Sequence, residues 1–260
     1  MSLAEINKLK ISIITATFNS KAHIESCIES VTSQSYKDIE YIIIDGGSID
    51  GTVQTVKDCE LTIKNKVNRF NFVSEPDGGI YDAMNKGIRI ATGDIVGTLN
   101  SDDQFYTKKA IELVANEFQN NNIDCCFGNL VFVDNSNKII RKWHSRPFES
   151  DLFAKSWTPA HPTFYCKREL FEKYGLYKTD YKIASDVELM LRFLEVMEVR
   201  SAFLNEYLVK MRTGGVSNQG IKSTIIITKE IKRAFRENGL TFNLSKYLFY
   251  KLLKLKEFIV

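Results

Sequence analysis

The sequence predicts an α/β protein with a mostly parallel sheet. Its first half alternates short apolar runs rich in β-branched residues with segments of helical periodicity, which is typical of βαβ units. Shorter strand-like pieces follow Gly128, so we expect the sheet to become mixed there. Two helical segments close the chain. We therefore expect a catalytic domain over residues 1–220 and a C-terminal helical extension over residues 221–260.

Each element is predicted from its own pattern. Apolar, β-branched runs predict strands at Lys10–Thr15, Ile39–Ile44, Asn71–Ser74, Ile95–Leu99, Leu130–Val133, Lys138–Trp143 and Thr163–Cys166. Apolar residues at helical spacing predict helices at Ile24–Val31, Ile111–Phe118, Ala184–Glu195, Ile221–Asn238 and Leu244–Val260. Ser185 and Glu188 have the spacing of a capping box at the start of the third of these helices.

Composition narrows the class of protein. Hydrophobic residues make up 44% of the 260 positions and charged residues 26%, as in ordinary globular proteins. No apolar run approaches the roughly 18 residues of a membrane-spanning helix, and Met1–Lys10 lacks the apolar segment of a secretory signal, so we expect a cytoplasmic location. The five cysteines form no Cys-x-x-Cys pair, which predicts free thiols.

The charge distribution argues against nucleic-acid binding. The net charge is +3. Residues 245–260 contain four lysines and one glutamate, so residues 1–244 carry 31 basic and 31 acidic side chains. Nucleic-acid binding needs clustered positive charge, and residues 1–244 carry no net positive charge.

Polar residues follow three of the predicted strands, where ligands bind in an open parallel sheet. Thr15 and Thr17 follow the first strand, Asp45 follows the second, and Asp102 and Asp103 follow the fourth. Two adjacent carboxylates can hold a hard divalent cation and leave positions for phosphate oxygens, or they can simply cap the next helix. Asp45 precedes two glycines. Its carboxylate could accept a hydrogen bond from a base or ribose, or it could simply be part of a turn.

Four blocks of sequence together resemble family 2 glycosyltransferases: Ile11–Asn19, Asp45–Thr52, Pro76–Gly87 and Asn100–Asp103. Their order and spacing match the family, and the resemblance covers about residues 10–215. It implies a GT-A fold with a Rossmann-like nucleotide-binding half. It further implies a nucleotide-sugar donor, Mn²⁺ or Mg²⁺, and direct displacement at the anomeric carbon with inversion.

The resemblance also assigns roles on the donor side. Thr15 and Thr17 match the nucleotide-contacting stretch, and Asp45 matches the acidic residue that contacts the base. Asp102 matches the last acidic residue of the Asp-x-Asp metal motif, and Asp103 joins it as a predicted metal ligand. The first position of that motif is Asn100 in this sequence. The ribose or metal contacts that a carboxylate makes at this position in the family are therefore in doubt here. We expect Asn100 and Ser101 to bind the donor.

Asp186 matches the general base of the family, the carboxylate that takes the proton of the acceptor hydroxyl. Its place in the first turn of a helix favours the ionised form, so a purely dipole-complementing role is the alternative. His161 resembles a residue on the acceptor side, and could equally be a packed loop histidine. Arg212 opens a segment, residues 212–217, that closes over the diphosphate in relatives; an ordinary surface arginine is the alternative.

The last sixteen residues resemble an interfacial helix. Leu248, Leu252, Leu255 and Ile259 lie broadly on one side, with Lys246 and Lys254 opposite. This pattern predicts peripheral contact with the cytoplasmic face of the inner membrane through residues 245–260. Packing on the protein body or in a homodimer would use the same pattern, and all three interpretations stay open.

The predicted function is metal-assisted transfer of a sugar, from a UDP- or GDP-sugar, to a glycan or lipid-linked glycan acceptor. The Pro76–Gly87 block resembles enzymes of bacterial exopolysaccharide synthesis, which points to cell-surface polysaccharide or lipopolysaccharide. A non-catalytic nucleotide-sugar or glycan-binding protein on the same scaffold is the alternative. A Rossmann dehydrogenase is disfavoured because no Gly-x-Gly-x-x-Gly follows the first strand.

Overall fold

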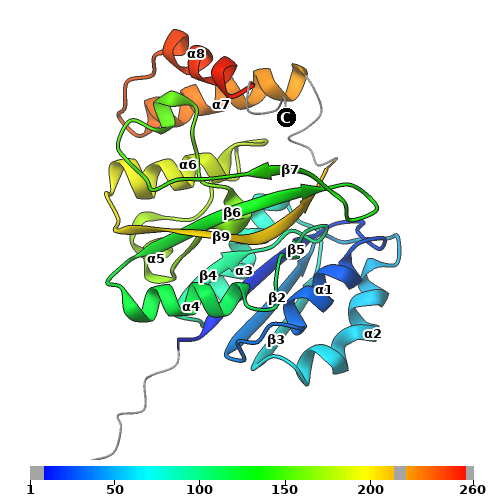
Figure 1. The fold of residues 1–260 in the computed structure, drawn as a ribbon. Coiled ribbons are helices and arrows are strands. Elements are labelled where there is room, and N and C mark those ends of the chain that lie inside the picture. The colour runs from blue at the N-terminus through cyan, green and yellow to red at the C-terminus, as the bar shows by residue number, and fades with distance from the viewer. Residues whose placement is uncertain (1–8, 214–220, 256–260) are drawn as a thin grey trace, which may run out of the picture.

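The computed structural model describes residues 9–213 and 221–255 as one α/β arrangement (Figure 1). The strands are β1 (Ile11–Thr17), β2 (Ile39–Asp45), β3 (Arg69–Ser74), β4 (Ile95–Thr98), β5 (Gln104–Phe105), β6 (Cys125–Val133), β7 (Ile139–Trp143), β8 (Tyr165–Lys167) and β9 (Ser201–Arg212). The α-helices are α1 (Ile24–Thr32), α2 (Thr52–Lys64), α3 (Ile80–Ile90), α4 (Ala110–Asn120), α5 (Glu169–Tyr174), α6 (Ser185–Leu191), α7 (Ile221–Glu237) and α8 (Leu244–Leu255). Short 3-10 helices η1 (Phe153–Lys155) and η2 (His161–Thr163) and a π-helical turn η3 (Arg192–Val196) complete the described elements.

A single sheet has the order β3-β2-β1-β4-β8-β6-β9-β5, with β7 paired to β6. Strands β1 to β4 are parallel to their neighbours in this half, which is the βαβ portion. Strand β8 pairs antiparallel with both β4 and β6, so the sheet becomes mixed there, as predicted. The carboxyl ends of β1, β2 and β4 consequently meet at one edge, where the polar segments of the sequence lie.

The sheet is covered on both faces because its central strands are apolar at successive positions. On one face Ile13 belongs to an apolar cluster that includes residues of α1, α2 and α4, and on the other Ile14 belongs to a cluster that includes residues of α3 and α6. All seven residues of β1 are buried, as expected for a strand between two helical layers. Gly87 of α3 lies against this strand, and a Cβ there would come within 2.5 Å of Ile14.

Two predicted boundaries were wrong. Strand β6 begins at Cys125, five residues before the predicted start, and passes through Gly128; the space beside that glycine is filled by Leu208 of β9. The segment predicted as a strand from Thr163 is instead a turn of 3-10 helix followed by β8. The reason is local, since the Thr163 hydroxyl donates 2.7 Å to the carbonyl of Ala160 and closes the turn.

The predicted capping box at α6 is also wrong. Ala184 occupies the N-cap position and no side chain caps the helix from there. Glu188 is fully buried, and its carboxylate pairs with Arg192 at 3.0 Å and with Lys178 at 3.0 Å. A buried carboxylate needs opposite charge more than a single backbone contact, so Glu188 turns toward these cations instead of reaching back to the helix start.

The C-terminal helices share the main core and do not form a separate unit. Ile231, Ala234 and Phe235 of α7 are buried, and Ile231 and Phe235 belong to the same cluster as α3 and α6. Tyr247 anchors α8 to that cluster. After residue 220 the chain therefore continues as the two helices α7 and α8, and these pack on the same core as the preceding elements.

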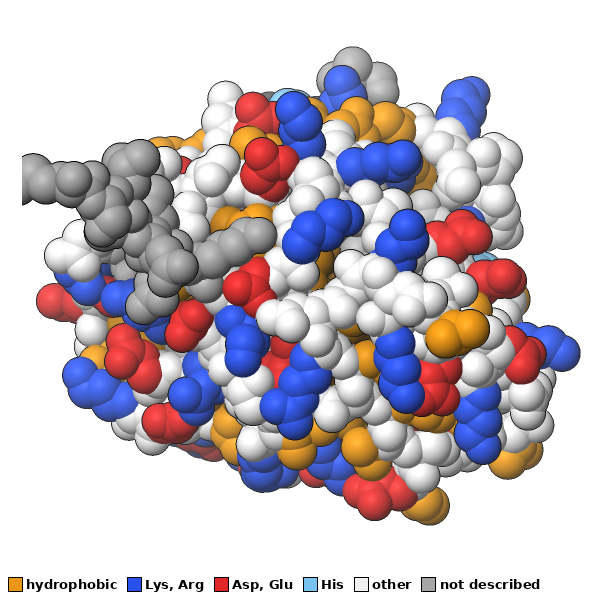
Figure 2. Space-filling model, turned by 90° about the horizontal axis from the view of Figure 1, so that it is seen from below, with side chains coloured by type: hydrophobic (Ala, Val, Ile, Leu, Met, Phe, Trp, Pro, Cys, Tyr) orange, Lys and Arg blue, Asp and Glu red, His pale blue; other side chains and the backbone are white. Residues whose placement is uncertain are grey.

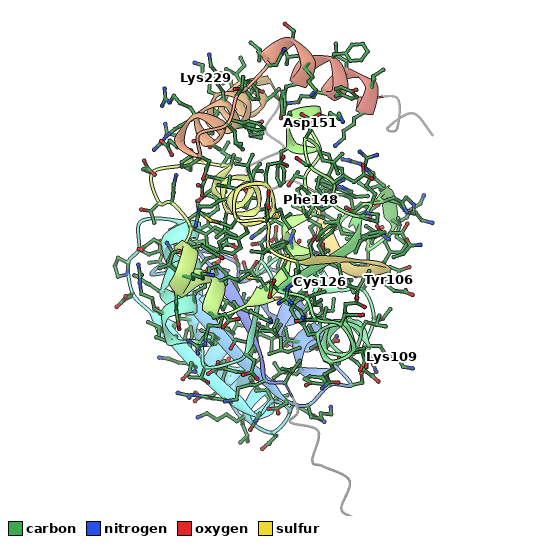
Figure 3. All side chains as sticks on the ribbon, turned by 90° about the vertical axis from the view of Figure 1, so that its left-hand side faces the viewer. Tyr106, Lys109, Cys126, Phe148, Asp151 and Lys229 are labelled. Carbon is green, nitrogen blue, oxygen red and sulfur yellow. The ribbon has the colours of Figure 1, made fainter. Side chains whose placement is uncertain are left out.

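The two lysines of α8 lie on the side away from its exposed apolar residues, as predicted. Lys246 binds both carboxylate oxygens of Asp151 at 2.7 Å, beneath α8 in Figure 3, and Lys254 donates to the carbonyl of Ser156. Both lysines thus face the protein body, to which α8 is held. Five apolar side chains of α8 are exposed: Leu244, Leu248, Phe249, Leu252 and Leu253. The side chain of Leu255 and the whole of Ile259 lie outside what the structure describes.

Three broader expectations can be compared with the described residues. All five cysteines are free thiols, as predicted, and Cys27, Cys125, Cys126 and Cys166 are buried. Among the described residues, no helix combines the length and the apolar character needed to cross a bilayer. On the face shown in Figure 2, acidic and basic side chains are interspersed, without a continuous basic surface.

Candidate active site

The loops that follow β1 and β2 are tied to each other at the edge of the sheet. The N–H of Asn19 donates 2.7 Å to the hydroxyl of Ser48, and the N–H of Ile49 donates 3.1 Å to the side-chain oxygen of Asn19. Asn19 adopts a left-handed backbone conformation, φ 48°, which asparagine tolerates well. The turn leaves Phe18 with 62% of its surface exposed beside this edge.

Asp45 holds the second of these loops together. Its Oδ2 accepts from the N–H groups of Gly47 and Ser48 at 3.1 and 3.0 Å and from the Ser74 hydroxyl at 2.7 Å, while its Oδ1 accepts from the Ser48 hydroxyl. The side chain is fully buried. Both oxygens therefore accept hydrogen bonds within the protein, and the contact with a base or ribose stays a prediction.

The two threonines of β1 have different surroundings. Thr15 is fully buried, with its hydroxyl 3.2 Å from that of Tyr41, on the face of the sheet that α1 covers. It is not placed to contact a nucleotide. Thr17, the last residue of β1, is 4% exposed, and its hydroxyl has no hydrogen-bond partner among the described residues. A buried hydroxyl without a partner is a candidate ligand contact.

Asp77 brings the Pro76–Gly87 block to the same edge. A Cβ added to Gly46 would lie only 2.8 Å from the Asp77 carboxylate. The same carboxylate accepts a hydrogen bond from the N–H of Gly79 at 2.8 Å. A larger residue at position 46 would push this carboxylate aside. The three loops after β1, β2 and β3 thus form one connected rim.

The segment after β4 is a turn closed by Asp103. The Asn100 amide donates 3.1 Å to one oxygen of Asp103, and the N–H of Arg212 donates 3.2 Å to the other. Asp103 is 1% exposed, and burial, helped by the negative charge of Asp102, raises its pKa well above the usual range. Asp103 consequently organises the turn, and this geometry does not support its predicted role as a metal ligand.

Asp102 is different, because it is partly exposed and its carboxylate makes no hydrogen bond among the described residues. The Ser101 hydroxyl, in contrast, is buried and donates 2.8 Å to that of Ser20. The described part of the chain contains no cluster of three or more His, Cys, Asp or Glu side chains able to hold a metal. One open carboxylate still fits a cation that takes its remaining ligands from a diphosphate and water.

Arg212 ends β9 close to this turn. Its backbone N–H is held by Asp103, and its guanidinium lies 3.4 Å from the side-chain oxygen of Asn137. The guanidinium Nε is buried and has no partner among the described residues. The structure thus brings Arg212 to the Asp102 turn, while residues 214–217 of the predicted closing segment lie outside the described ranges.

On the acceptor side, a chain of contacts connects the end of β4 to Asp186. Thr98 of β4 lies 3.4 Å from Nε2 of His161, which is 2.9 Å from the hydroxyl of Tyr177. The Tyr177 ring stacks on Tyr81 with centroids 5.8 Å apart. The Tyr81 hydroxyl, in turn, donates to the carbonyl of Ile183 and lies 3.3 Å from Oδ1 of Asp186.

Burial tunes the protonation of this chain. It lowers the pKa of the His161 imidazole, and the negative charge of Asp186 opposes the shift. Burial, with the charge of Asp186 in support, raises the pKa of the Tyr81 phenol. Near neutral pH, His161 is therefore uncharged, and Tyr81 keeps its single proton, which is shared between the Ile183 carbonyl and the Asp186 carboxylate.

The prediction from sequence did not assign functions to Tyr81, Asn85 or Tyr177. Tyr81 and Asn85 both lie in the Pro76–Gly87 block, four positions apart and so on one face of α3. The Asn85 amide is buried, donates 2.8 Å to the carbonyl of Tyr177 and accepts 3.0 Å from its N–H. The four-residue spacing of Tyr81 and Asn85 could have indicated that both lie on one face of a helix. That Tyr177 is the hydrogen-bond partner of Asn85 is seen only in the folded structure.

Comparison with known proteins identifies the family of this chain. The family model described as "Glycosyl transferase family 2" matches residues 12–179. A "PGL/p-HBAD biosynthesis glycosyltransferase" of Mycobacterium bovis is 25% identical over 223 residues, 85% of this chain and 82% of the relative. An uncharacterized glycosyltransferase of Mycobacterium tuberculosis is 34% identical over 197 residues, 72% of this chain and 70% of the relative.

Solved structures show the same architecture at low identity. Staphylococcus aureus TarS 1-349 with UDP-GlcNAc has a TM-score of 0.63 at 18% identity, over 93% of this chain and 79% of that one. The mannosyltransferase PcManGT of Pyrobaculum calidifontis, with GDP-Man and Mn²⁺, has a TM-score of 0.64 at 20% identity, over 88% of this chain and 64% of that one. This chain spans 40% of another TarS chain. It belongs to glycosyltransferase family 2 and has the GT-A fold.

Proposed function

We propose that this glycosyltransferase moves a sugar from a nucleotide-diphosphate sugar to an acceptor hydroxyl, with inversion at the anomeric carbon and help from a divalent cation. The observation that carries the proposal is the contact chain from Thr98, at the end of β4, to Asp186. It links the strand that precedes the open carboxylate of Asp102 to the predicted base. Two carboxylates with separate tasks are what a displacement of diphosphate by an alcohol requires.

The donor side is assigned to the rim after β1 and β2. Thr17 offers a buried hydroxyl without a partner, and Phe18 offers an exposed ring on which a base can stack. Asn100 and Arg212 lie at the Asp102 turn and are proposed to contact the diphosphate. Structural neighbours in complex with UDP-GlcNAc and with GDP-Man support a UDP- or GDP-sugar as the donor class.

Asp102 is proposed to hold Mn²⁺ or Mg²⁺ together with diphosphate oxygens. A bound cation would supply charge to offset the negative charge that develops on the departing diphosphate. Asp103 contributes indirectly, because it fixes the turn that carries Asp102 and tethers the backbone of Arg212. The neighbouring PcManGT complex contains Mn²⁺, which supports the choice of cation.

Asp186 is proposed to receive the acceptor proton. As the acceptor oxygen forms its bond to the anomeric carbon, its O–H bond breaks and the proton passes to the Asp186 carboxylate. The bond from the anomeric carbon to the diphosphate oxygen breaks on the opposite side, and its electron pair leaves with the diphosphate. Tyr81 orients the carboxylate from 3.3 Å, and uncharged His161 can hydrogen-bond the sugar or its acceptor.

The acceptor class is proposed to be a glycan or lipid-linked glycan of a bacterial cell surface. Relatives are named for PGL/p-HBAD biosynthesis and, over 54% of this chain, as a chondroitin synthase. These names support saccharide acceptors in general. A non-catalytic binding protein would not need the Tyr81 contact to Asp186, so we place it second.

We propose that α8 provides an apolar contact with the cytoplasmic face of the membrane. Leu248, Phe249 and Leu252 are 41%, 58% and 63% exposed on a helix that is itself anchored to the body. Co-sedimentation with anionic vesicles should fall for Phe249→Ser/Leu252→Ser and not for Leu61→Ser on α2. A concentration-dependent dimer that the double variant abolishes would assign the surface to self-association instead.

Donor turnover tests the catalytic proposal. The purified chain with Mn²⁺ is incubated with UDP-GlcNAc, UDP-glucose, UDP-galactose, GDP-mannose and dTDP-glucose, and release of the nucleoside diphosphate is measured. One donor should be consumed, slowly with water alone. Asp102→Ala and Asp186→Asn should each reduce turnover at least about 100-fold in folded protein, as expected for groups that act on the reacting atoms. Full activity of either variant removes the role assigned to that residue.

A further inference from the structure

The carboxylate of Glu230 on α7 binds the backbone immediately ahead of α6. Its Oε1 accepts from the N–H of Lys182 at 2.6 Å, and its Oε2 accepts from the N–H groups of Ile183 and Ala184 at 3.0 and 2.9 Å. Glu230 is only 9% exposed. Helix α6 begins at the next residue and carries Asp186 in its first turn.

Segment 182–184 is held from two sides. The Glu230 carboxylate accepts hydrogen bonds from the N–H groups of the segment, and the Tyr81 hydroxyl of α3 donates to the carbonyl of Ile183. Helix α6 makes no side-chain cap of its own, and the Ser185 hydroxyl has no partner among the described residues. The entry into α6, and with it the direction of Asp186, thus depends on contacts from α3 and α7.

We infer that Glu230 is a positioning residue for the reaction, which fixes Asp186 through the backbone of segment 182–184. The inference rests on the proposed role of Asp186 as the base. It extends the active site into α7, a helix that lies beyond residues 12–179 matched by the family model. The C-terminal helices then complete the site instead of merely adding to the body.

The contact can be removed without releasing α7, because other contacts hold that helix. Ile231, Ala234 and Phe235 are buried, and Asn238 donates 3.1 Å to the carboxylate of Glu188 on α6. Lys178 also pairs with Glu237 at 2.9 Å. Loss of Glu230 alone is therefore expected to loosen segment 182–184 locally, while α7 stays docked on α6.

Glu230→Gln is the sharpest variant. It keeps the shape of the side chain but turns an amide NH₂ toward backbone N–H donors, so at least one of the three hydrogen bonds is lost. Glu237→Gln is the matched control: it is on the same helix and loses the same charge, but its carboxylate contacts Lys178, Tyr181 and Arg233 and not segment 182–184. Glu230→Asp keeps both acceptor oxygens on a shorter arm.

Hydrolysis kinetics with the donor of the panel that the wild type consumes give the first readout. We expect Glu230→Gln to lower kcat about 10- to 100-fold, since small misplacement of a reacting group has effects of this order, with the donor KM changed less than about twofold. Glu230→Asp should recover part of the loss, and Glu237→Gln should retain wild-type kcat. Equal kcat in Glu230→Gln and Glu237→Gln would overturn the inference.

Hydrogen exchange gives a readout that needs no activity. Amides 182–184 should exchange at least about tenfold faster in Glu230→Gln than in Glu237→Gln, as expected when a protecting hydrogen bond opens locally. Unchanged protection there would overturn the inference. If Asp186→Asn keeps full activity, or no donor is consumed, it is the proposed function that fails, and the exchange experiment still decides whether Glu230 fixes the segment.

Discussion

The hydroxyl of Tyr81 lies 3.3 Å from Oδ1 of Asp186, although 105 positions separate the two residues in the chain. Tyr81 comes from α3 in the nucleotide-binding half, and Asp186 comes from α6 beyond the mixed part of the sheet. Because the same hydroxyl donates to the carbonyl of Ile183, one phenol fixes both the backbone entry to α6 and its carboxylate.

Tyr81→Phe should therefore lower kcat by about tenfold, which corresponds to loss of about 1.4 kcal/mol from one hydrogen bond. The donor KM should change little, because the donor rim lies on the loops after β1 and β2. Steady-state hydrolysis kinetics test this, with Tyr207→Phe as control, since that hydroxyl contacts the exposed His144. An unchanged kcat in Tyr81→Phe would remove the phenol from the positioning of Asp186.

Phe18→Ala should raise the donor KM by about tenfold and leave kcat nearly unchanged. The ring is 62% exposed beside the carboxyl ends of β1 and β2, and stacking of a base on an aromatic side chain contributes about 1–3 kcal/mol. Isothermal titration with the nucleoside diphosphate and Mn²⁺ measures the same loss directly. Leu61→Ala on α2, which is 72% exposed, is the matched surface control. If both variants bind alike, the base stacks elsewhere.

His161 should make stability depend on pH. Burial lowers its folded pKa below the unfolded value of about 6.5, so the unfolded chain binds the proton first as the pH falls. This contribution to stability is present above the unfolded pKa and declines as the pH drops toward the folded pKa. Tm measured at pH 7.5 and 5.5 should fall less for His161→Gln than for the wild type. An equal fall in Tm for His161→Gln and the wild type would contradict this assignment.

Glu188→Ala should destabilise the fold by about 3–5 kcal/mol. The substitution leaves Arg192, which is 7% exposed, without its carboxylate in the interior. Urea unfolding measures the loss against Glu172→Ala, where the partner Arg168 is exposed and the cost should stay below about 1 kcal/mol. The double variant Glu188→Leu/Arg192→Met should recover much of the loss, since it removes both charges. Equal stability of Glu188→Ala and Glu172→Ala would show that the buried pair is not required.

Much of the fold could be predicted because local patterns and the final structure agree. The apolar runs from Lys10 and Ile39 have no polar face, and the structure buries them between two helical layers as β1 and β2. The polar residues after β1, β2 and β4 meet at one edge because parallel strands end on the same side. Non-local contacts were not readable in this way: the Thr163 hydroxyl also accepts 3.1 Å from the N–H of Gly128, 35 positions away.

The candidate site, too, could be predicted only in part from the sequence. The positions after predicted strands identified Asp45 and Asp103, and the family resemblance identified Asp186, but neither could tell a carboxylate open to a ligand from one used inside the protein. Asp45 and Asp103 are held by hydrogen bonds from neighbouring loops, and only the folded chain supplies those donors. Glu230 was unremarkable in the sequence for the same reason, since its three backbone partners lie about 46 to 48 positions away.

The central claim is that Asp102 and Asp186 act on one donor from opposite sides of its anomeric carbon. A crystal structure of the full chain with Mn²⁺ and an unreactive analogue of the donor that it consumes tests this most directly. The account predicts the cation on the Asp102 carboxylate and the diphosphate, with the Asp186 carboxylate facing the anomeric carbon on the side away from the diphosphate. A bound donor whose anomeric carbon is out of reach of Asp186, or whose cation is held without Asp102, would contradict it.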